Sequence, residues 1–243
     1  MARQPADWDA RLTASQSVIT ALPLTISAWG NVAYTGQSRR VARVFDTGQV
    51  NDWIEIGINN ISPYVAVLVA RDSATGAHTV STSGGVTTGN WYHFCGTVVS
   101  ASERYIYLNG TDKGGGAGLT TKTPTLNAFS IGGPANWGWD GPIAEYAVWN
   151  VVLTDAEVLI LSKGYPPLFV RPESLVCYVP LINDDDDDLI GGLSFSATGS
   201  ISTVAHTTVF YPAVIPPILG HITAVAPLIN TGTITRSPMW GTY

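Results

Sequence analysis

The sequence predicts an all-β protein built as an antiparallel sandwich. The 243-residue chain contains 25 glycines and 15 prolines, spread between short segments rich in valine, isoleucine, threonine and aromatic residues. These segments recur about every 10 to 15 residues, a spacing typical of a sandwich. Because 45% of the residues are hydrophobic, the chain can bury one sizeable core, and we expect a single main domain over residues 1–210.

The expected strands follow one another from the first third of the chain to its middle. In chain order they are residues 24–29, 41–45, 53–58, 64–70, 78–81, 91–99, 105–108, 128–131 and 143–149. Asn109 and Gly110 predict a tight hairpin after residues 105–108, because both residues tolerate a positive φ. The glycine-rich run 114–118 has almost no side chains to pack, so we expect a mobile loop there.

One short helix is expected over residues 154–163. Thr154 and Glu157 form an S/T-x-x-E capping box, the usual signature of a helix start. We expect this helix to cover an end of the sandwich with Val158 and Leu161.

Four motifs in a fixed order carry a family resemblance. They are P-L-T-I-S-A-W at 23–29, N-W-Y-H-F at 90–94, Y-L-N-G at 107–110, and G-P-I-A-E-Y-A-V-W at 141–149 with the helix that follows. Their order resembles that of laminin-G-like domains, which have the concanavalin A-like jelly-roll fold. The resemblance covers residues 20–165, and it implies a domain that binds a partner rather than one that catalyses a reaction.

The sequence departs from this family pattern in one respect. Many domains of this family begin with a strand that resembles residues 175–181, followed by an acidic loop like 184–188 and a glycine-rich strand like 191–195. Here these segments follow the helix. We therefore predict a permuted jelly roll, in which residues 175–205 fill the sheet position of the displaced first strand. Such a permutation is allowed because the termini of domains often lie close together.

Composition excludes several classes of partner. Only 12% of the residues are charged and the net charge is −6, so nucleic-acid binding is not expected. The N-terminus lacks the apolar core of a signal peptide, and no segment has the roughly 18 apolar residues of a membrane span. We therefore expect synthesis in a host cytoplasm and no contact with membranes. Cys95 and Cys177 are expected to be buried free thiols.

The sequence does not predict an enzyme. A jelly-roll glycosidase needs two carboxylates that face one cleft about 5 Å apart. Asp52 and Glu55 differ by an odd number of positions and would point to opposite faces of a strand, while Glu145 stands alone in its strand. The histidines lack metal-ligand spacing; they are His78, His93, His206 and His221.

The best candidate for ligand binding is the segment Asn136, Trp137, Trp139 and Asp140. Exposed tryptophan faces stack on sugars, and neighbouring Asn and Asp side chains can hydrogen-bond to hydroxyl groups, so surface glycans are a candidate partner. The alternative is that these large aromatic residues cap the core ahead of the closing strand.

The acidic run is a candidate calcium site. Asp184, Asp186 and Asp188 could present alternate carboxylates to this hard cation, and the alternative is a solvated loop in which like charges repel. The family resemblance also implies that calcium can lie near Asp46 or Asp140. Calcium is the one cofactor considered.

Residues 211–243 are apolar, nearly uncharged and punctuated by proline, which predicts an extended tail that needs a partner. The alternatives are docking on its own sandwich and docking on neighbouring subunits, since extended segments readily add to a sheet edge. The residues expected to make these assembly contacts are Tyr211, Ile215, Ile218, Leu219, Trp240 and Tyr243.

Two functions follow from these observations. The first is a structural protein of a bacteriophage virion, a capsid decoration or fibre-like protein, anchored to other virion subunits by its tail and assembled as a homo-oligomer. This expectation draws on the resemblance to laminin-G-like proteins found on phage particles, and it places the protein in the virion. The alternative is a carbohydrate-binding module or lectin, which could depend on calcium.

Overall fold

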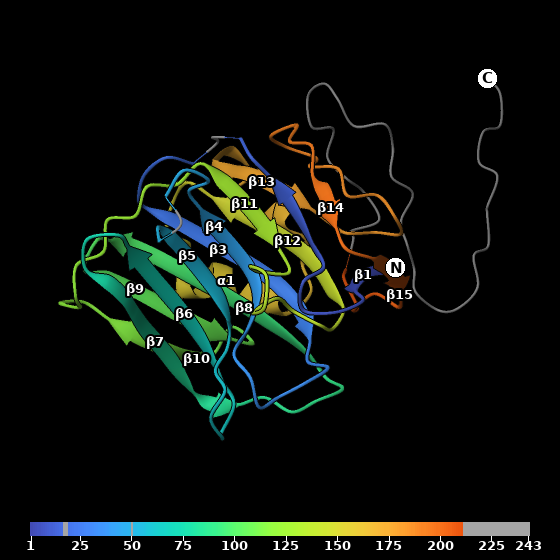
Figure 1. Ribbon diagram of the computed structural model, residues 1–243, viewed down its shortest axis with the longest axis horizontal. Coiled ribbons are helices and arrows are strands. Elements are labelled where there is room, and N and C mark those ends of the chain that lie inside the picture. The colour runs from blue at the N-terminus through green and yellow to red at the C-terminus, as the bar shows by residue number, and fades with distance from the viewer. Residues whose placement is uncertain (17–18, 50, 211–243) are drawn as a thin grey trace.

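Two antiparallel β-sheets pack face to face (Figure 1). The computed structural model describes residues 1–16, 19–49 and 51–210. The all-β sandwich predicted from the sequence is confirmed, and a hydrophobic core lies between the two sheets.

The first sheet has eight strands. Their spatial order is β10 (Asp112–Gly116), β9 (Glu103–Leu108), β8 (Trp91–Ser100), β3 (Leu24–Asn31), β12 (Ile143–Trp149), β1 (Ala2–Pro5) and β15 (Ile201–Val204), and β13 (Leu175–Val179) also pairs with β12.

The second sheet has seven strands. Their order is β14 (Ser196–Thr198), β2 (Arg11–Ala14), β11 (Ala128–Ile131), β4 (Arg39–Phe45), β5 (Trp53–Ile58), β6 (Val65–Asp72) and β7 (Gly76–Gly85). Every strand that was predicted from the sequence is present, although some strands begin or end a few residues away from the predicted bounds. The strands that were not predicted are short and polar, such as β1, β2 and β14.

Strand β5 illustrates why these residues form a two-sided sheet. Ile54, Ile56 and Ile58 are completely buried in the core between the sheets. Because side chains alternate along a strand, Trp53 and Glu55 point to the outer face of the seven-stranded sheet. This alternation places charged and aromatic groups on that outer face.

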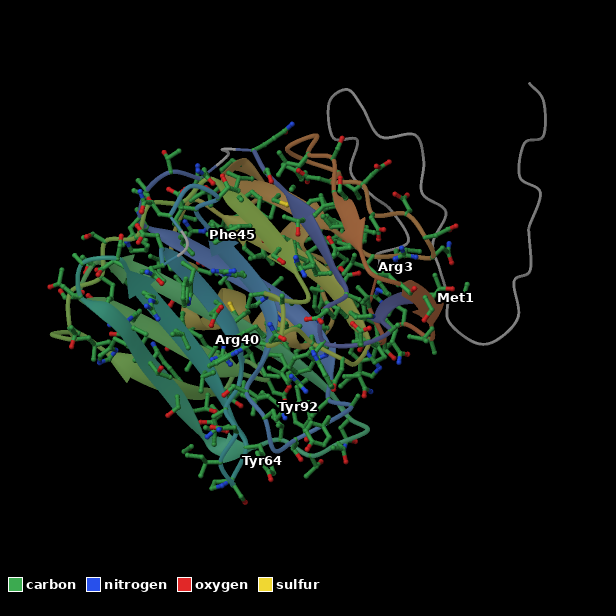
Figure 2. The ribbon with its side chains drawn as sticks, in the orientation of Figure 1. Met1, Arg3, Arg40, Phe45, Tyr64 and Tyr92 are labelled. Atoms are coloured by element: carbon green, nitrogen blue, oxygen red, sulfur yellow. The ribbon has the colours of Figure 1, made fainter. Side chains whose placement is uncertain are left out.

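Tyr64 and Tyr92 hold the connection between β7 and β8 at one end of the core (Figure 2). The backbone N–H of Val86 donates to the carbonyl of Tyr64 at 2.7 Å. The backbone N–H of Thr87 donates to the Tyr92 hydroxyl at 3.0 Å. The two tyrosines therefore close the core with their rings and fix the loop with their polar atoms.

Helix α1 (Asp155–Ser162) forms a third layer. Thr154 caps it, and the predicted capping box with Glu157 is present. The expected position at an end of the sandwich is wrong, because Val158 and Leu161 pack on the outer face of the eight-stranded sheet. The 3-10 turns η1 (Pro167–Phe169) and η2 (Pro172–Ser174) then lead the chain back to β13.

The segment after the helix returns to the sandwich. Residues 146–149 of β12 pair with β13, while β14 pairs with β2 and β15 pairs with β1. Strand β13 therefore occupies a place in the eight-stranded sheet beside the closing strand. Residues 175–179 thus stay within the sandwich, and the permutation itself stays a prediction.

The hairpin between β9 and β10 was predicted correctly, but the glycine run after it was not. Asn109 and Gly110 have φ values of 52° and 74°. Residues 114–116 form the end of β10 rather than a mobile loop. An ideal Cβ on Gly114 would lie 1.8 Å from the carbonyl oxygen of Ser81, so glycine lets the edge strands β10 and β7 approach closely.

Cys95 and Cys177 are both free and buried, as predicted. No helix within the described part of the chain is long and apolar enough to cross a membrane.

Candidate functional site

The loop between β11 and β12 carries the predicted ligand-binding residues, and it is held tightly to the sheet. The backbone N–H of Arg40 donates to the carbonyl of Trp137 at 2.8 Å. The N–H of Gly138 donates to the carbonyl of Trp8 at 3.1 Å, and the N–H of Trp139 to that of Gly132 at 2.7 Å. These contacts fix the backbone on both sides of Trp137.

Trp139 does not present a face to a ligand. Its side chain is buried, lies edge-on to Phe94 with ring centres 5.5 Å apart, and donates from Nε1 to the carbonyl of Asn31 at 3.0 Å. The expectation that Trp139 stacks on a sugar is therefore corrected, and the alternative that it caps the core describes it. The contact with Phe94 of β8 therefore determines that Trp139 is buried.

Asp140 belongs to an ion pair instead of an open ligand surface. Its carboxylate Oδ2 lies 3.7 Å from Nε of Arg39, whose side chain is buried. Burial raises the pKa of Asp140, and the charge of Arg39 opposes this effect. Asp140 therefore offsets the buried charge of Arg39, and it does not line the hollow beside Trp137.

Trp137 is the exposed member of the loop, with 50% of its surface accessible. The Arg40 guanidinium carbon lies over the indole, 5.5 Å from the ring centre. Arg40 is itself fixed, because Nε donates to Glu55 Oε1 at 2.7 Å and Nη1 donates to the carbonyl of Ile58 at 2.9 Å. The result is an indole held from one side and open to solvent.

A bulge in β4 explains how Arg40 reaches this position. The register of β4 against β5 shifts between Arg40 and Ala42, and Arg40 pairs with Gly57. An ideal Cβ on Gly57 would lie 1.9 Å from the carbonyl oxygen of Arg39, so only glycine fits opposite the bulge. The bulge turns Arg40 toward Trp137 (Figure 2 labels Arg40).

A hollow of about 240 Å³ opens beside the indole. Its lining consists of one aromatic ring, three side-chain amides and one hydroxyl group, from Trp137, Gln37, Asn60, Asn136 and Ser38. Asn136 has a φ of 65°, and its backbone N–H donates to Asp9 Oδ1 at 2.7 Å. The structure thus brings the predicted Asn136 and Trp137 together and separates them from Trp139 and Asp140.

Sequence reasoning missed Gln37, Ser38 and Asn60. They lie in polar loops next to β4 and β5, and only the fold brings them to the Trp137 loop. It also missed two further exposed aromatic residues. Trp8 and Tyr34 are 46% and 48% exposed, and the Arg39 guanidinium carbon lies 5.2 and 5.8 Å from their ring centres.

The sequence matches one family model, described as the concanavalin A-like lectin/glucanases superfamily, over residues 7–159. This match covers more than half of the chain. The chain belongs to the concanavalin A-like lectin/glucanases superfamily. The predicted laminin-G-like resemblance is therefore confirmed, whereas the comparisons give no support to the bacteriophage context.

Solved structures show the same superfamily fold. A heptameric SAP-like pentraxin from Limulus polyphemus has a TM-score of 0.61 and 15% identity, covering 82% of this chain and 92% of the pentraxin. A Bacteroides ovatus protein described as carbohydrate-binding has a TM-score of 0.59 and 20% identity, covering 85% of this chain and 61% of that protein. None of the curated proteins that were compared matches the chain.

The calcium site predicted in the acidic run stays a prediction, but its three carboxylates do not come together in the structure. Among the described residues, no three His, Cys, Asp or Glu side chains gather closely enough to hold a metal ion. Asp188 instead accepts backbone hydrogen bonds from Tyr178 at 2.8 Å and Gly191 at 3.0 Å. Asp186 pairs with Arg3 at 2.9 Å, and Asp184 is exposed. Asp186 and Asp188 have separate partners, so these two carboxylates do not face one site.

The alternative calcium positions are also occupied by protein contacts. Asp46 accepts hydrogen bonds from the backbone N–H of Gly48 at 2.7 Å and from the side-chain amide of Asn127 at 2.9 Å. The hydrogen bond from the Thr125 hydroxyl lowers the pKa of Asp46 most, and the bonds from Gly48 and Asn127 lower it further. The residues expected in the assembly tail, from Tyr211 to Tyr243, lie outside the described residues.

Proposed function

We propose that this chain is a non-enzymatic glycan-binding domain, and that it binds a sugar in the hollow beside Trp137. The observation that carries the proposal is the half-exposed indole, fixed by Arg40 and bordered by the side chains of Asn136, Asn60 and Gln37. An apolar ring face next to amide donors and acceptors matches the chemistry of a sugar ring.

The size and rigidity of the site support recognition of one sugar unit. The hollow, about 240 Å³, is smaller than the roughly 300–1,000 Å³ of pockets that enclose a drug-sized ligand. Because Arg40 and the backbone contacts already hold Trp137 in place, little side-chain order is lost on binding. Trp8 and Tyr34, on the neighbouring Arg39, offer a surface for further sugar units.

The contacts of the buried glutamates support a binding function rather than hydrolysis. Glu55 is held by Arg40 on the seven-stranded sheet. Glu145 accepts from the Tyr178 hydroxyl at 2.7 Å on the eight-stranded sheet. Glu55 points to the outer face of the seven-stranded sheet, and Glu145 bonds to Tyr178, which packs with α1 on the outer face of the eight-stranded sheet. The sandwich core therefore separates the two carboxylates, so they do not flank one glycosidic bond.

The comparisons add general support. The superfamily description includes lectins, and one protein of similar fold is described as carbohydrate-binding. No contact among the described residues favours a virion structural protein, and the tail expected to anchor such a protein, residues 211–243, lies outside them.

A glycan array followed by calorimetry with the best-bound oligosaccharide tests this function. Trp137→Ala should weaken binding at least about tenfold, because it removes the stacking surface. Tyr165→Ala is the matched control, since Tyr165 is 48% exposed but follows α1 on the other side of the molecule. Equal binding by wild type and Trp137→Ala would contradict the site. An array without any bound glycan would contradict the function.

A further inference from the structure

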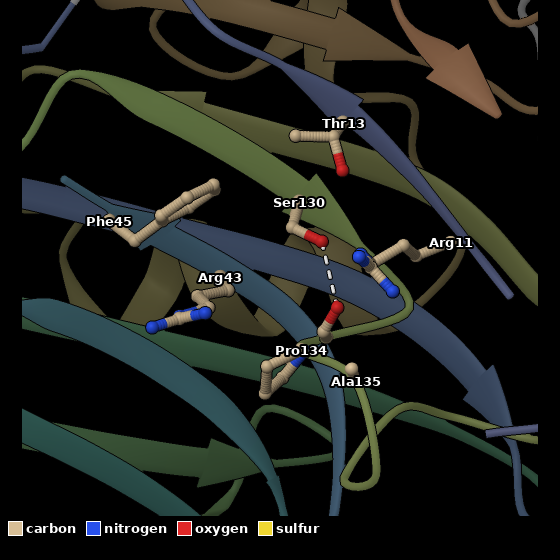
Figure 3. Close-up of a pocket in the computed structure, with 8 residues that line it drawn as sticks. Arg11, Thr13, Arg43, Phe45, Ser130, Pro134 and Ala135 are labelled. Atoms are coloured by element: carbon tan, nitrogen blue, oxygen red, sulfur yellow. Dashed lines mark hydrogen bonds between the residues drawn. The ribbon is translucent and has the colours of Figure 1, made fainter. Parts of the chain in front are cut away.

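A second hollow lies on the outer face of the seven-stranded sheet (Figure 3). It has a volume of about 170 Å³. Arg11 of β2 and Arg43 of β4 line it from two sides, with Ser130 of β11 between them (Figure 3). The Ser130 hydroxyl donates to the carbonyl of Gly133 at 2.9 Å, which ties the floor of the hollow to the Trp137 loop.

Arg43 is a nearly buried cation without a hydrogen-bond partner in the described part of the chain. Only 13% of its side chain is exposed, and Nε is buried and unpaired. The rings of Phe45 and Trp53 each lie 4.7 Å from its guanidinium carbon. Aromatic contacts hold the position of the guanidinium, but they leave the buried Nε–H donor unsatisfied. A buried polar group in this state requires an explanation.

Among the described residues, Glu55 is the carboxylate within ion-pair distance of Arg43, and Arg43 shares it with Arg40. Glu55 Oε2 is 3.7 Å from Arg43 Nε, which is beyond hydrogen-bond distance, while Glu55 Oε1 accepts from Arg40 at 2.7 Å. One carboxylate therefore lies between two guanidinium groups and cannot neutralise both. Arg43 and Arg11 are left as two cations that face one small space.

The two cations repel each other. Burial lowers the pKa of Arg43, Glu55 acts in the opposite direction, and the charge of Arg11 lowers this pKa further. Arg11 uses one N–H of Nη1 for the carbonyl of Asp9, at 2.8 Å, and retains other donors. An anion between the two guanidinium groups would relieve the repulsion and satisfy the idle donors.

We propose that this hollow binds the carboxylate of an acidic sugar, so that the glycan recognised by this domain carries a uronate or sialate unit. The inference rests on the proposed glycan-binding function, because successive residues of one loop line the two hollows. Pro134 and Ala135 line the second hollow, and the next two residues, Asn136 and Trp137, line the first.

A carboxylate fits this hollow better than a polyanion does. The planar fork of a guanidinium matches the two oxygens of a carboxylate. The hollow is small, and the chain as a whole has a net charge of −6, so an extended polyanion would meet repulsion outside it. The hydroxyls of Thr13 and Ser130 complete the site with groups that can bond to sugar hydroxyls.

Calorimetry with matched probes tests the proposal. The uronate probe is the galacturonic acid trimer, and its control is the methyl ester of the same trimer, which lacks the charges. The sialate probe is 3′-sialyllactose, and its control is lactose. Arg11→Gln and Arg43→Gln should each weaken binding of the preferred acidic probe about tenfold, while binding of its neutral control stays unchanged.

Arg71→Gln is the matched control variant. Arg71 stacks on Trp53 at 4.9 Å on the same outer face, but it does not line the hollow. It should therefore keep the preference for the acidic probe. Thermal unfolding of each variant shows that it is folded, and Arg11→Gln tests the site independently if Arg43→Gln is unstable, because Arg11 belongs to a different strand, β2.

The outcomes separate the two proposals. Preference for one acidic probe, lost in the Arg11 and Arg43 variants but kept in Arg71→Gln, supports the carboxylate subsite and identifies the source of the carboxylate. Equal binding of acidic and neutral probes overturns the subsite and leaves the proposed function intact. Preference for sulfated oligosaccharides over both carboxylated probes overturns the carboxylate assignment. Binding of no saccharide at all overturns both proposals.

Discussion

The guanidinium of Arg40 lies over the indole of Trp137, with 5.5 Å between the guanidinium carbon and the ring centre. The same Arg40 donates from Nε to Glu55 at 2.7 Å. A buried ion pair within the sheet is thus connected to an exposed aromatic ring at the surface. This connection explains how a loop residue can be positioned as firmly as a residue of a strand.

Glu55→Gln should destabilise the protein by about 3–5 kcal/mol, because it leaves the buried Arg40 without a charged partner. Urea unfolding at neutral pH measures this loss. Arg171→Gln breaks the more exposed pair of Arg171 with Glu157 and should cost no more than about 1 kcal/mol. Similar losses in both variants would show that burial does not make the Arg40 pair special.

The glycines of β10 allow a test of how the two sheets meet. Gly114→Ala should destabilise the protein by about 1 kcal/mol or more, since its Cβ would lie 1.8 Å from the Ser81 carbonyl oxygen and the strands would have to separate. Gly116→Ala is the control, because nothing lies within 4 Å of its ideal Cβ. Thermal unfolding should lower the Tm of the first variant only. Equal Tm values would contradict the close approach.

Local features were predictable from the sequence, and features that depend on distant partners were not. The alternation of Ile54, Ile56 and Ile58 and the Asn109–Gly110 turn each fix their own conformation through neighbouring residues. By contrast, Trp137 and Trp139 flank one glycine, and no local pattern tells which is exposed. Contacts with Arg40 and Phe94, far away in the sequence, decide it.

Distant partners also decided the fate of the acidic run and of the glycine run. The sequence showed five consecutive aspartates but not that the backbone near residue 178 would approach one of them. It showed the glycines of residues 114–116 but not the carbonyl of Ser81 against which Gly114 packs. Composition suggested a metal site in the acidic run and a loop in the glycine run. Tertiary contacts instead make Asp188 a hydrogen-bond acceptor for the backbone and place residues 114–116 in β10.

Asp188→Ala should destabilise the protein by about 2 kcal/mol or more, because its carboxylate accepts backbone hydrogen bonds from Tyr178, Ile190 and Gly191. Asp184→Ala should have little effect, since Asp184 is exposed. Chemical unfolding compares the two variants. Adding calcium should not raise the Tm of the wild type. A rise in Tm that is lost in Asp184→Ala and also in Asp188→Ala would support a calcium site in the acidic run.

His93 should make stability depend on pH. Burial lowers its pKa to about 3, and its Nε2 lies 2.9 Å from the Ser27 hydroxyl. An unfolded histidine has a pKa of about 6.5, so the unfolded state binds the proton first as the pH falls. The free energy of unfolding therefore keeps its full contribution from neutral His93 above pH ~6.5. This contribution should decrease by about 1.4 kcal/mol per pH unit as the pH falls toward ~3. Urea unfolding at several pH values should show a smaller pH dependence for His93→Gln than for wild type; parallel curves would contradict a neutral buried His93.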